Sequence, residues 1–383
     1  MQKLISSIIF LFLSLIDAQQ ICQDYYYQPG FCVPLESCPS LLQLNRRSFA
    51  DRQILSYNVC SGVYDKIPKY CCQDARNVQK IEKITTTTTT KRPAVPSISS
   101  SGSLPVPGSG NCGLHVNDKI FGGNQTGISE HPWMAMLQYT WMNGRKSFHC
   151  GGALINDRYV LTAAHCISRR ATYDKPRLTG VRLGEWNVDT DPDCQEFGFT
   201  SECSQPPQDF AIEEMIVHEG YQTGSPGSPN DIALVRLSRA ARFSPFVRPL
   251  CLPTATELQT KIDFSGTKFE VVGWGMTEKG FKSSIKLKVD VPYVSKENCQ
   301  AAWPRKTLME TQICAGGEEG KDSCSGDSGG PLITQHADNE GNRYLYAAGV
   351  VSWGSKACGL ENVPGVYTRV GAYVDWISSK IRE

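Results

Sequence analysis

The sequence predicts an all-β protein, with one large domain or two fused barrels behind a small segment rich in cysteine. Short runs of β-branched and aromatic residues, separated by Gly, Pro and Asn turns, recur through residues 120–383; YVLTA, FEVVGWG and YAAGVVSWG are examples. Six of the 16 cysteines lie within residues 22–72. The closing stretch YVDWISSKI has helical spacing. These observations predict β-strands for most of the chain and a helix at its end.

Residues 1–18 predict a secretory signal peptide. Lys3 precedes an almost wholly apolar run, residues 4–16, and Ala18 supplies a small residue for cleavage. The run is shorter than the roughly 20 residues that span a bilayer, and no later run reaches that length. An even number of cysteines suits an oxidising compartment. We therefore expect a secreted, extracellular protein with no membrane span, and a net charge of +1 gives no electrostatic case for binding nucleic acid or an anionic membrane.

Residues 21–72 are too few to build much of a core without covalent staples, so we expect three disulfides there. Counting does not fix which of the six cysteines pair. Residues 73–111 contain six consecutive threonines and then a Ser/Pro/Gly tract, which predicts an extended linker open to O-glycosylation. Residues 112–119 connect this linker to the large domain, residues 120–383.

The stretch GKDSCSGDSGGP, residues 320–331, places Ser328 among glycines. Such clusters are usually turns, so this stretch alone does not decide a function. A serine hydroxyl is a weak nucleophile unless a base takes its proton, and imidazole is the usual base. The candidate base is His165 in LTAAHC, where Cys166 can bridge to Cys150 and fix the histidine. We expect surface or structural roles for the other histidines: His115, His131, His149, His218 and His336.

A catalytic imidazole also needs a carboxylate to orient it. In NDIALVRL, Asp231 stands directly before an apolar strand, although taken alone it is more typical of a turn residue at a strand entry. Together LTAAHC, NDIAL and GDSGGP, in the order His, Asp, Ser, resemble the chymotrypsin-like serine proteases. This resemblance covers residues 120–383 and implies a chymotrypsin-like double β-barrel with a C-terminal helix.

The resemblance also implies a role for each matched residue. Ser328 is the expected nucleophile, His165 the general base and then acid, and Asp231 the buried partner of the imidazole. The backbone N–H groups of Gly326 and Ser328 are expected to form the oxyanion hole. Catalysis of this kind needs no cofactor.

Asp322, six residues before Ser328, matches the floor of the family's primary specificity pocket, where a carboxylate implies cleavage after Arg or Lys. Gly354 in VSWGS and Gly365 in VPGVY match the pocket walls, which must stay open for a long side chain. The alternative for Asp322 is a solvated aspartate in a loop.

The stretch DKIFGGN resembles the family's activation site. Cleavage after Lys119 would free the α-amine of Ile120, which is expected to pair with Asp327 and so form the oxyanion hole and the pocket. The uncleaved chain is therefore expected to be an inactive zymogen.

The cysteines after residue 120 number nine, so parity requires one bridge to Cys112. Resemblance gives this partner as Cys251, and it gives Cys150–Cys166, Cys299–Cys314 and Cys324–Cys358; elimination leaves Cys194–Cys203. The first six cysteines, including adjacent Cys71 and Cys72, resemble the clip domain of arthropod clip-domain serine proteases. That resemblance implies the pairs Cys22–Cys71, Cys32–Cys60 and Cys38–Cys72.

A clip domain joined by a long linker to a trypsin-like zymogen resembles the proteases of extracellular cascades, in particular the easter-like and prophenoloxidase-activating proteases. That resemblance implies melanisation or Toll signalling in haemolymph. The expected partners are protein substrates (other zymogens, prophenoloxidase or a cytokine precursor), an upstream trypsin-like activator and serpin inhibitors. The alternatives are a developmental cascade, a non-catalytic homologue that acts as a binding cofactor, and a digestive trypsin. A digestive trypsin would have no use for an N-terminal clip domain. The alternative for the clip segment is a simple propiece held together by disulfides, without a binding role.

Two further features lie near the start of the large domain. Similar proteases bind calcium in the loop that matches GEWNVDTDPDC, where the ligands would be Glu185, the carbonyl of Asn187, Thr190 and Asp193. A merely solvated acidic loop is the alternative. NQT, residues 124–126, makes Asn124 the one N-glycosylation sequon of the sequence.

Overall fold

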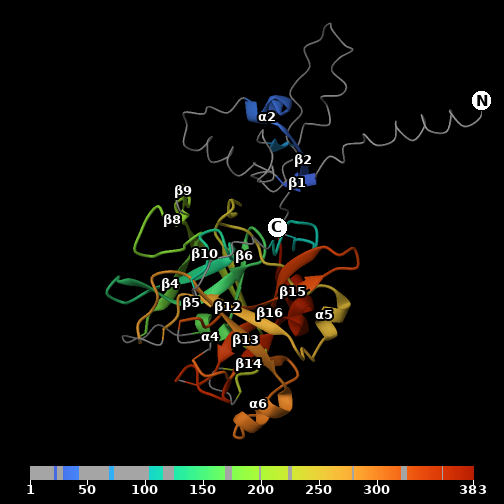
Figure 1. The fold of residues 1–383 in the computed structure, drawn as a ribbon. Coiled ribbons are helices and arrows are strands. Elements are labelled where there is room, and N and C mark those ends of the chain that lie inside the picture. The colour runs from blue at the N-terminus through green and yellow to red at the C-terminus, as the bar shows by residue number, and fades with distance from the viewer. Residues whose placement is uncertain are drawn as a thin grey trace, which may run out of the picture. The chain divides into compact units, whose positions relative to one another are not determined.

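The computed structural model divides the chain into two compact units, residues 1–95 and 96–383, which are described separately below (Figure 1). The described residues are 21–23, 29–42, 69–72, 103–114, 125–168, 175–197, 200–222, 227–277, 280–320, 326–355 and 357–383. Several expectations lie outside these residues: the signal peptide, most of the linker, Lys119, Ile120, Asn124, Asp322, Cys60 and Cys324.

The first unit contains a three-stranded antiparallel sheet in the order β1-β2-β3. Buried Val33 and Leu41 pack with Cys38 and Cys72, which form a disulfide. So small a cluster buries little apolar surface, and the covalent bond supplies what the core does not. The elements are β1 (Ile21–Gln23), β2 (Pro29–Pro34), the 3-10 helix η1 (Leu35–Ser37), α2 (Pro39–Leu42) and β3 (Lys69–Cys72).

The second unit contains two closed six-stranded antiparallel barrels, which confirms the predicted fold class. The first barrel has the order β10-β11-β6-β5-β4-β7. Its strands are β4 (Met134–Thr140), β5 (Lys146–Leu154), β6 (Tyr159–Thr162), β7 (Arg177–Leu183), β10 (Gln208–Val217) and β11 (Ala233–Leu237). A two-stranded ribbon, β8 (Cys194–Phe197) with β9 (Thr200–Cys203), extends between β7 and β10 of the chain.

The second barrel has the order β12-β13-β14-β17-β16-β15. Its strands are β12 (Lys268–Gly273), β13 (Leu287–Val294), β14 (Gln312–Gly316), β15 (Pro331–Ala337), β16 (Arg343–Trp353) and β17 (Pro364–Arg369). The helices of this unit are α4 (Ala164–Ile167), α5 (Thr256–Thr260), α6 (Lys296–Ala302), the 3-10 helix η3 (Val370–Tyr373) and the closing α7 (Val374–Lys380).

One hydrophobic cluster runs through both barrels. It joins Leu161 of β6 and Leu234 of β11 to Val350 of β16, and Ile377 docks α7 onto it. Burial of such side chains contributes about 1.5–3 kcal/mol each. Because this shared core fixes the two barrels against each other, loops from both barrels can meet in a defined geometry.

Disulfides fix several of these loops. Among the described cysteines, the structure joins Cys112–Cys251, Cys150–Cys166, Cys194–Cys203 and Cys299–Cys314, besides the bridge in the first unit. The Cys112–Cys251 bond ties the segment before the large domain to the second barrel. Cys32, Cys71 and Cys358 are also disulfide-bonded, and the partners expected for them fall outside the described side chains.

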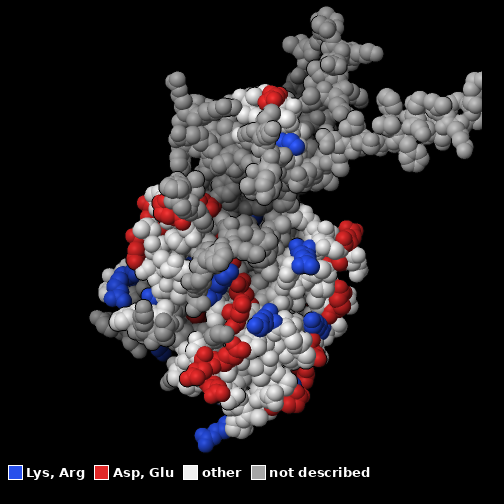
Figure 2. Space-filling view, viewed as in Figure 1, with Lys and Arg blue, Asp and Glu red and all other residues white. Residues whose placement is uncertain are grey.

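The surface of the second unit carries both signs of charge. On the face that Figure 2 shows, basic and acidic side chains of the described residues are interspersed, without a continuous basic patch. Separately, none of the helices in the described part of the chain has the length and apolar character needed to cross a membrane.

Candidate active site

The three candidate catalytic residues lie where the two barrels meet. His165 is on α4, directly after β6, and Asp231 directly precedes β11, the neighbour of β6 in the first barrel. Ser328 lies in the turn before β15 of the second barrel. The backbone N–H of Gly151 on β5 donates to the Ser328 carbonyl at 2.9 Å, so a hydrogen bond connects the serine loop to the first barrel.

Asp231 holds the imidazole of His165. His165 Nδ1 lies 2.8 Å from Asp231 Oδ2, and the His165 backbone N–H donates to Oδ1 at 2.9 Å. The Asp231 side chain is only 1 % exposed, whereas that of His165 is 21 % exposed. With Nδ1–H directed at the carboxylate, Nε2 carries the lone pair that can accept a proton from a nucleophile.

Two further hydroxyls satisfy the buried aspartate. Ser352 Oγ donates to Asp231 Oδ2 at 2.5 Å, and Thr368 Oγ1 donates to the Asp231 carbonyl at 2.8 Å. A buried carboxylate is costly unless it accepts hydrogen bonds, so the Ser352 hydroxyl satisfies the Asp231 carboxylate, whereas the Thr368 hydroxyl holds the Asp231 backbone. Sequence reasoning missed both. Ser352 stands in VSWGS, the stretch quoted for Gly354, but nothing in the sequence paired it with Asp231.

Glycines give the serine loop its shape. Gly326 has φ of +115°, and a Cβ there would lie 2.9 Å from the Cα of Gly275. Gly329 has φ of +80°, and a Cβ there would lie 2.2 Å from Thr162 Oγ1. Both positions therefore require glycine. The loop brings the backbone of Ser328 against the first barrel without a neighbouring side chain in the way.

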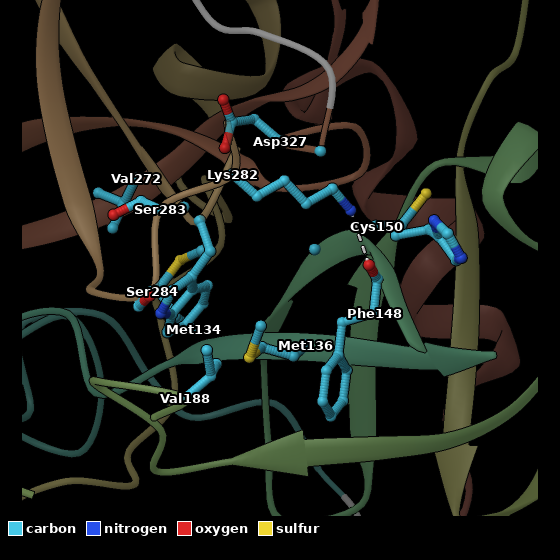
Figure 3. A pocket seen from close by; sticks show the side chains of 15 residues that line it. Met134, Met136, Phe148, Cys150, Val188, Val272, Lys282, Ser283, Ser284 and Asp327 are labelled. Atoms are coloured by element: carbon cyan, nitrogen blue, oxygen red, sulfur yellow. Dashed lines mark hydrogen bonds between the residues drawn. The ribbon is translucent and has the colours of Figure 1, made fainter. Parts of the chain in front are cut away.

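The carboxylate of Asp327 lies against a second pair of glycines. Gly275 N–H donates to Asp327 Oδ1 at 2.9 Å. A Cβ at Gly273 or at Gly275 would come within 2.2–2.3 Å of an Asp327 carboxylate oxygen. Asp327 and Gly326 also line a cavity, together with Lys282 (Figure 3).

The expected walls of the specificity pocket, Gly354 directly after β16 and Gly365 of β17, lie side by side. A Cβ at Gly354 would lie 3.6 Å from the Cα of Gly365, so no side chain separates the two strands at this point. Asp322, the expected floor, lies outside the described residues.

The acidic loop brings together the residues expected to hold calcium. Glu185 and Asp193 are buried, and burial together with the nearby Asp193 charge raises the pKa of Glu185. Thr190 Oγ1 donates to Asp193 Oδ1 at 2.5 Å, and Asn187 contributes its carbonyl to the same turn. Arg182 Nη1 pairs with Glu185 Oε2 at 3.1 Å and offsets part of the repulsion between the two buried carboxylates. The donors are all oxygens, the ligand type that a hard ion such as calcium takes.

His131, for which a surface or structural role was expected, lies in a buried cluster of charges. Its Nε2 is 3.1 Å from Glu270 and 3.5 Å from Glu130, and Lys288 also pairs with both carboxylates. Although burial opposes the shift, the nearby carboxylates of Glu130 and Glu270 raise the pKa of His131. Lys286 is buried beside this cluster, and its Nζ donates to the His131 carbonyl at 3.5 Å. No motif in the sequence pointed to this cluster.

Comparison with known proteins identifies the family. Residues 120–377 match the trypsin family model, and residues 22–72 match that of the regulatory CLIP domain of proteinases. The chain belongs to the arthropod clip-domain serine proteases of the trypsin family. Members of the trypsin family need no cofactor for catalysis.

Relatives of this clip-domain protease match it over nearly their whole length. It is 41 % identical to "Serine protease ea" of Drosophila melanogaster, over 92 % of this chain and 88 % of the relative. It is also 41 % identical to "Melanization protease 1" of the same species, over 95 % of this chain and 94 % of the relative. Among solved structures, the Drosophila Grass clip serine protease of the Toll pathway aligns with a TM-score of 0.62 at 30 % identity, covering 94 % of this chain and 96 % of that one.

Proposed function

We propose that this chain is the secreted zymogen of a trypsin-like serine endopeptidase. The observation that carries the proposal is the hydrogen-bonded pair of His165 and Asp231 at the barrel junction, in the fold and family where such a pair activates a serine. The presence of Ser328 together with this pair argues against a non-catalytic binding homologue.

The chemistry follows from these groups. Ser328 Oγ attacks the substrate carbonyl carbon while His165 Nε2 takes the hydroxyl proton, and Asp231 stabilises the resulting imidazolium. The N–H groups of Gly326 and Ser328 donate to the oxyanion of the tetrahedral intermediate. When the C–N bond breaks, His165 returns the proton to the leaving amine. Water then attacks the acyl-enzyme by the same steps and restores the serine.

We infer cleavage after Arg or Lys from Asp322 at the expected pocket floor. Neither Gly354 nor Gly365 presents a side chain at the expected walls, which supports the entry of a long side chain. Asp322→Ala should lower kcat/KM for arginine substrates by several orders of magnitude, because the substrate cation would lose its counter-charge.

Activation is proposed to follow cleavage after Lys119, when the Ile120 α-ammonium pairs with Asp327. The reference pKa of an α-amine is about 7.7–8.0, and the ion pair raises it. Stability of the active conformation from this pair is therefore fully present below about pH 7.7 and is lost as the pH rises through the raised pKa. A rate profile that stays flat far into the alkaline range would contradict the pairing.

The family relationship supports a role in an extracellular cascade of innate immunity. One relative is named for melanization and the solved relative for the Toll pathway, so we propose prophenoloxidase activation or processing of a Toll ligand, with a developmental cascade as the alternative. In this proposal residues 1–18 are the signal peptide, 21–72 the clip domain, 73–111 the linker, 112–119 the activation segment and 120–383 the protease domain. The protein acts in haemolymph on other zymogens, prophenoloxidase or a cytokine precursor, and is controlled by an upstream protease and serpins.

We also propose that the loop containing Glu185 and Asp193 binds calcium, and that Asn124 carries a glycan. Addition of EDTA should lower the melting temperature of the wild type, and Asp193→Asn should reduce that response. An unchanged melting temperature and activity on chelation would remove calcium from the proposal. Mass analysis before and after N-glycosidase treatment tests the glycan.

The central experiment uses the secreted full chain. It is treated with a lysine-specific protease, the new amino terminus is sequenced, and hydrolysis of Arg and Lys chromogenic substrates is followed beside a Ser328→Ala control. Appearance of Ile120 with activity in the wild type alone supports the zymogen. Appearance of Ile120 without hydrolysis of any peptide would favour the binding homologue.

A further inference from the structure

A cavity of about 220 Å³ lies beside the serine loop (Figure 3). Met134, Met136 and Phe148 of the first barrel form an apolar side. Lys282 and Asp327 are its charged lining residues. The remaining lining residues are His149, Cys150, Gly151, Val188, Val272, Gly273, Trp274, Ser283, Ser284 and Gly326.

The cavity adjoins the leaving-group side of the reaction, an assignment that rests on the proposed function. The pocket wall Gly354 directly follows β16 and Gly365 belongs to β17 of the second barrel, whereas Cys150 and Gly151 of the cavity belong to β5 of the first. A substrate that places its Arg or Lys side chain between the walls and its carbonyl at Ser328 must continue toward β5. The residues after the scissile bond therefore pass over this cavity.

Lys282 is positioned at the edge of this path. Its Nζ donates to the Phe148 carbonyl at 2.8 Å, which links its hairpin to β5 (Figure 3). A Cβ built at Gly326 would lie 3.6 Å from Lys282 Cε, so the side chain runs along the expected oxyanion loop. The hairpin is closed by a hydrogen bond from Thr277 N–H to the Phe281 carbonyl at 2.9 Å. An ammonium has three N–H donors, and the bond to Phe148 uses one of them, so Lys282 can also donate to a ligand.

The surrounding charges favour an anionic ligand. Asp327 is the one negative charge among the lining residues and acts on Lys282, although Figure 3 shows the Lys282 ammonium extending away from the Asp327 carboxylate toward Cys150. In the proposed active enzyme Asp327 pairs with the Ile120 α-ammonium, which leaves the Lys282 charge for a ligand. The acidic loop, residues 184–194, contributes only apolar Val188 to the lining.

We propose that Lys282 is a specificity-determining residue that selects protein substrates with an acidic side chain shortly after the scissile bond. Exposed ion pairs contribute about 0.2–1 kcal/mol, so the expected preference for an acid over its neutral amide is about 1.5- to 5-fold in kcat/KM. Ionic screening should reduce this preference in high salt.

The test uses internally quenched peptides of one sequence that place Glu, Gln or Lys, in turn, at each of the first three residues after the scissile Arg. The activated wild type should cleave the Glu peptide faster than the Gln and Lys peptides at one or more positions. Lys282→Gln should abolish the preference, and Lys282→Glu should invert it toward Lys. Lys268→Gln, which removes an exposed lysine of β12, is the matched control and should keep the wild-type ratios.

Each rate is divided by the same variant's turnover of a chromogenic Arg substrate, which has no residue after the scissile bond. This ratio separates peptide selection from a general loss of activity. Equal cleavage of all peptides by an active wild type, or an unaltered preference in Lys282→Gln, would overturn the inference and leave the proposed function intact. Absence of chromogenic turnover in the cleaved wild type would refute the proposed function itself.

Discussion

The buried lysine Lys286 offers a direct test of the electrostatics of this fold. Its side chain is almost fully buried, and its Nζ donates only a long hydrogen bond, 3.5 Å, to a neutral carbonyl. Burial lowers the pKa of Lys286 from 10.5 to about 8, although the charges of Glu130, Glu185 and Asp193 oppose the shift. Replacement by methionine keeps an unbranched side chain and removes the charge.

The size and sign of the expected change in stability follow from the linkage between proton binding and folding. One pKa unit corresponds to about 1.4 kcal/mol, so protonated Lys286 costs the folded state about 3 kcal/mol below pH 8. Between pH 8 and 10.5 the unfolded chain binds this proton and the folded chain does not, so the wild type gains stability as the pH rises. Lys286→Met should therefore be more stable by up to about 3 kcal/mol at pH 7, and the difference should shrink toward pH 10.

Urea denaturation at pH 7 and pH 10 measures the difference. A Ser328→Ala background prevents self-digestion, and EDTA keeps any cation out of the acidic loop near Glu185. Lys268→Met, which changes an exposed lysine, is the control and should show little change at either pH. A Lys286→Met variant that is less stable than the wild type at pH 7 would refute the reasoning, because attraction by the three carboxylates would then exceed the cost of burial.

Three other substitutions test contacts around the site. Gly275→Ala would place a Cβ 2.3 Å from a carboxylate oxygen of Asp327, so peptide hydrolysis by the activated enzyme should fall at least about tenfold. Ser352→Ala removes a hydroxyl donor to Asp231. Because loss of a hydrogen bond to a charged group costs about 1.5–3 kcal/mol, kcat/KM should fall by a factor of about 10 or more. Ser352→Thr keeps a hydroxyl and should retain more activity. Gly113→Ala would place a Cβ 2.0 Å from a carbonyl oxygen of β16 at φ of +60°, so urea denaturation should show a loss of about 1–3 kcal/mol.

Local sequence patterns predicted the fold class and the candidate catalytic residues of this protein. Short β-branched and aromatic runs between Gly, Pro and Asn turns predicted the all-β class, because these residue types favour extended backbone and the turn residues mark the strand ends. Three short motifs pointed to Ser328, His165 and Asp231, because the chemistry of proton transfer restricts which residue types can cooperate. The cysteine pattern predicted a stapled first segment, because so short a segment cannot bury enough apolar surface.

The contacts between residues far apart in the chain could not be predicted from local sequence patterns. Asp231 meets His165 across 66 residues and Ser352 across 121. Neither hydrophobic periodicity nor secondary-structure propensity specifies contacts between residues so far apart in the sequence.

The sequence by itself determined which residues can carry chemistry and which segments prefer to be strands. Only the tertiary structure decided that Ser352 donates a hydrogen bond to Asp231, that Lys286 is buried, and that Lys282 lies beside Gly326. The physical reason is that solvation and contact depend on how two barrels pack around a shared core. Residue type and spacing along the chain do not specify that packing.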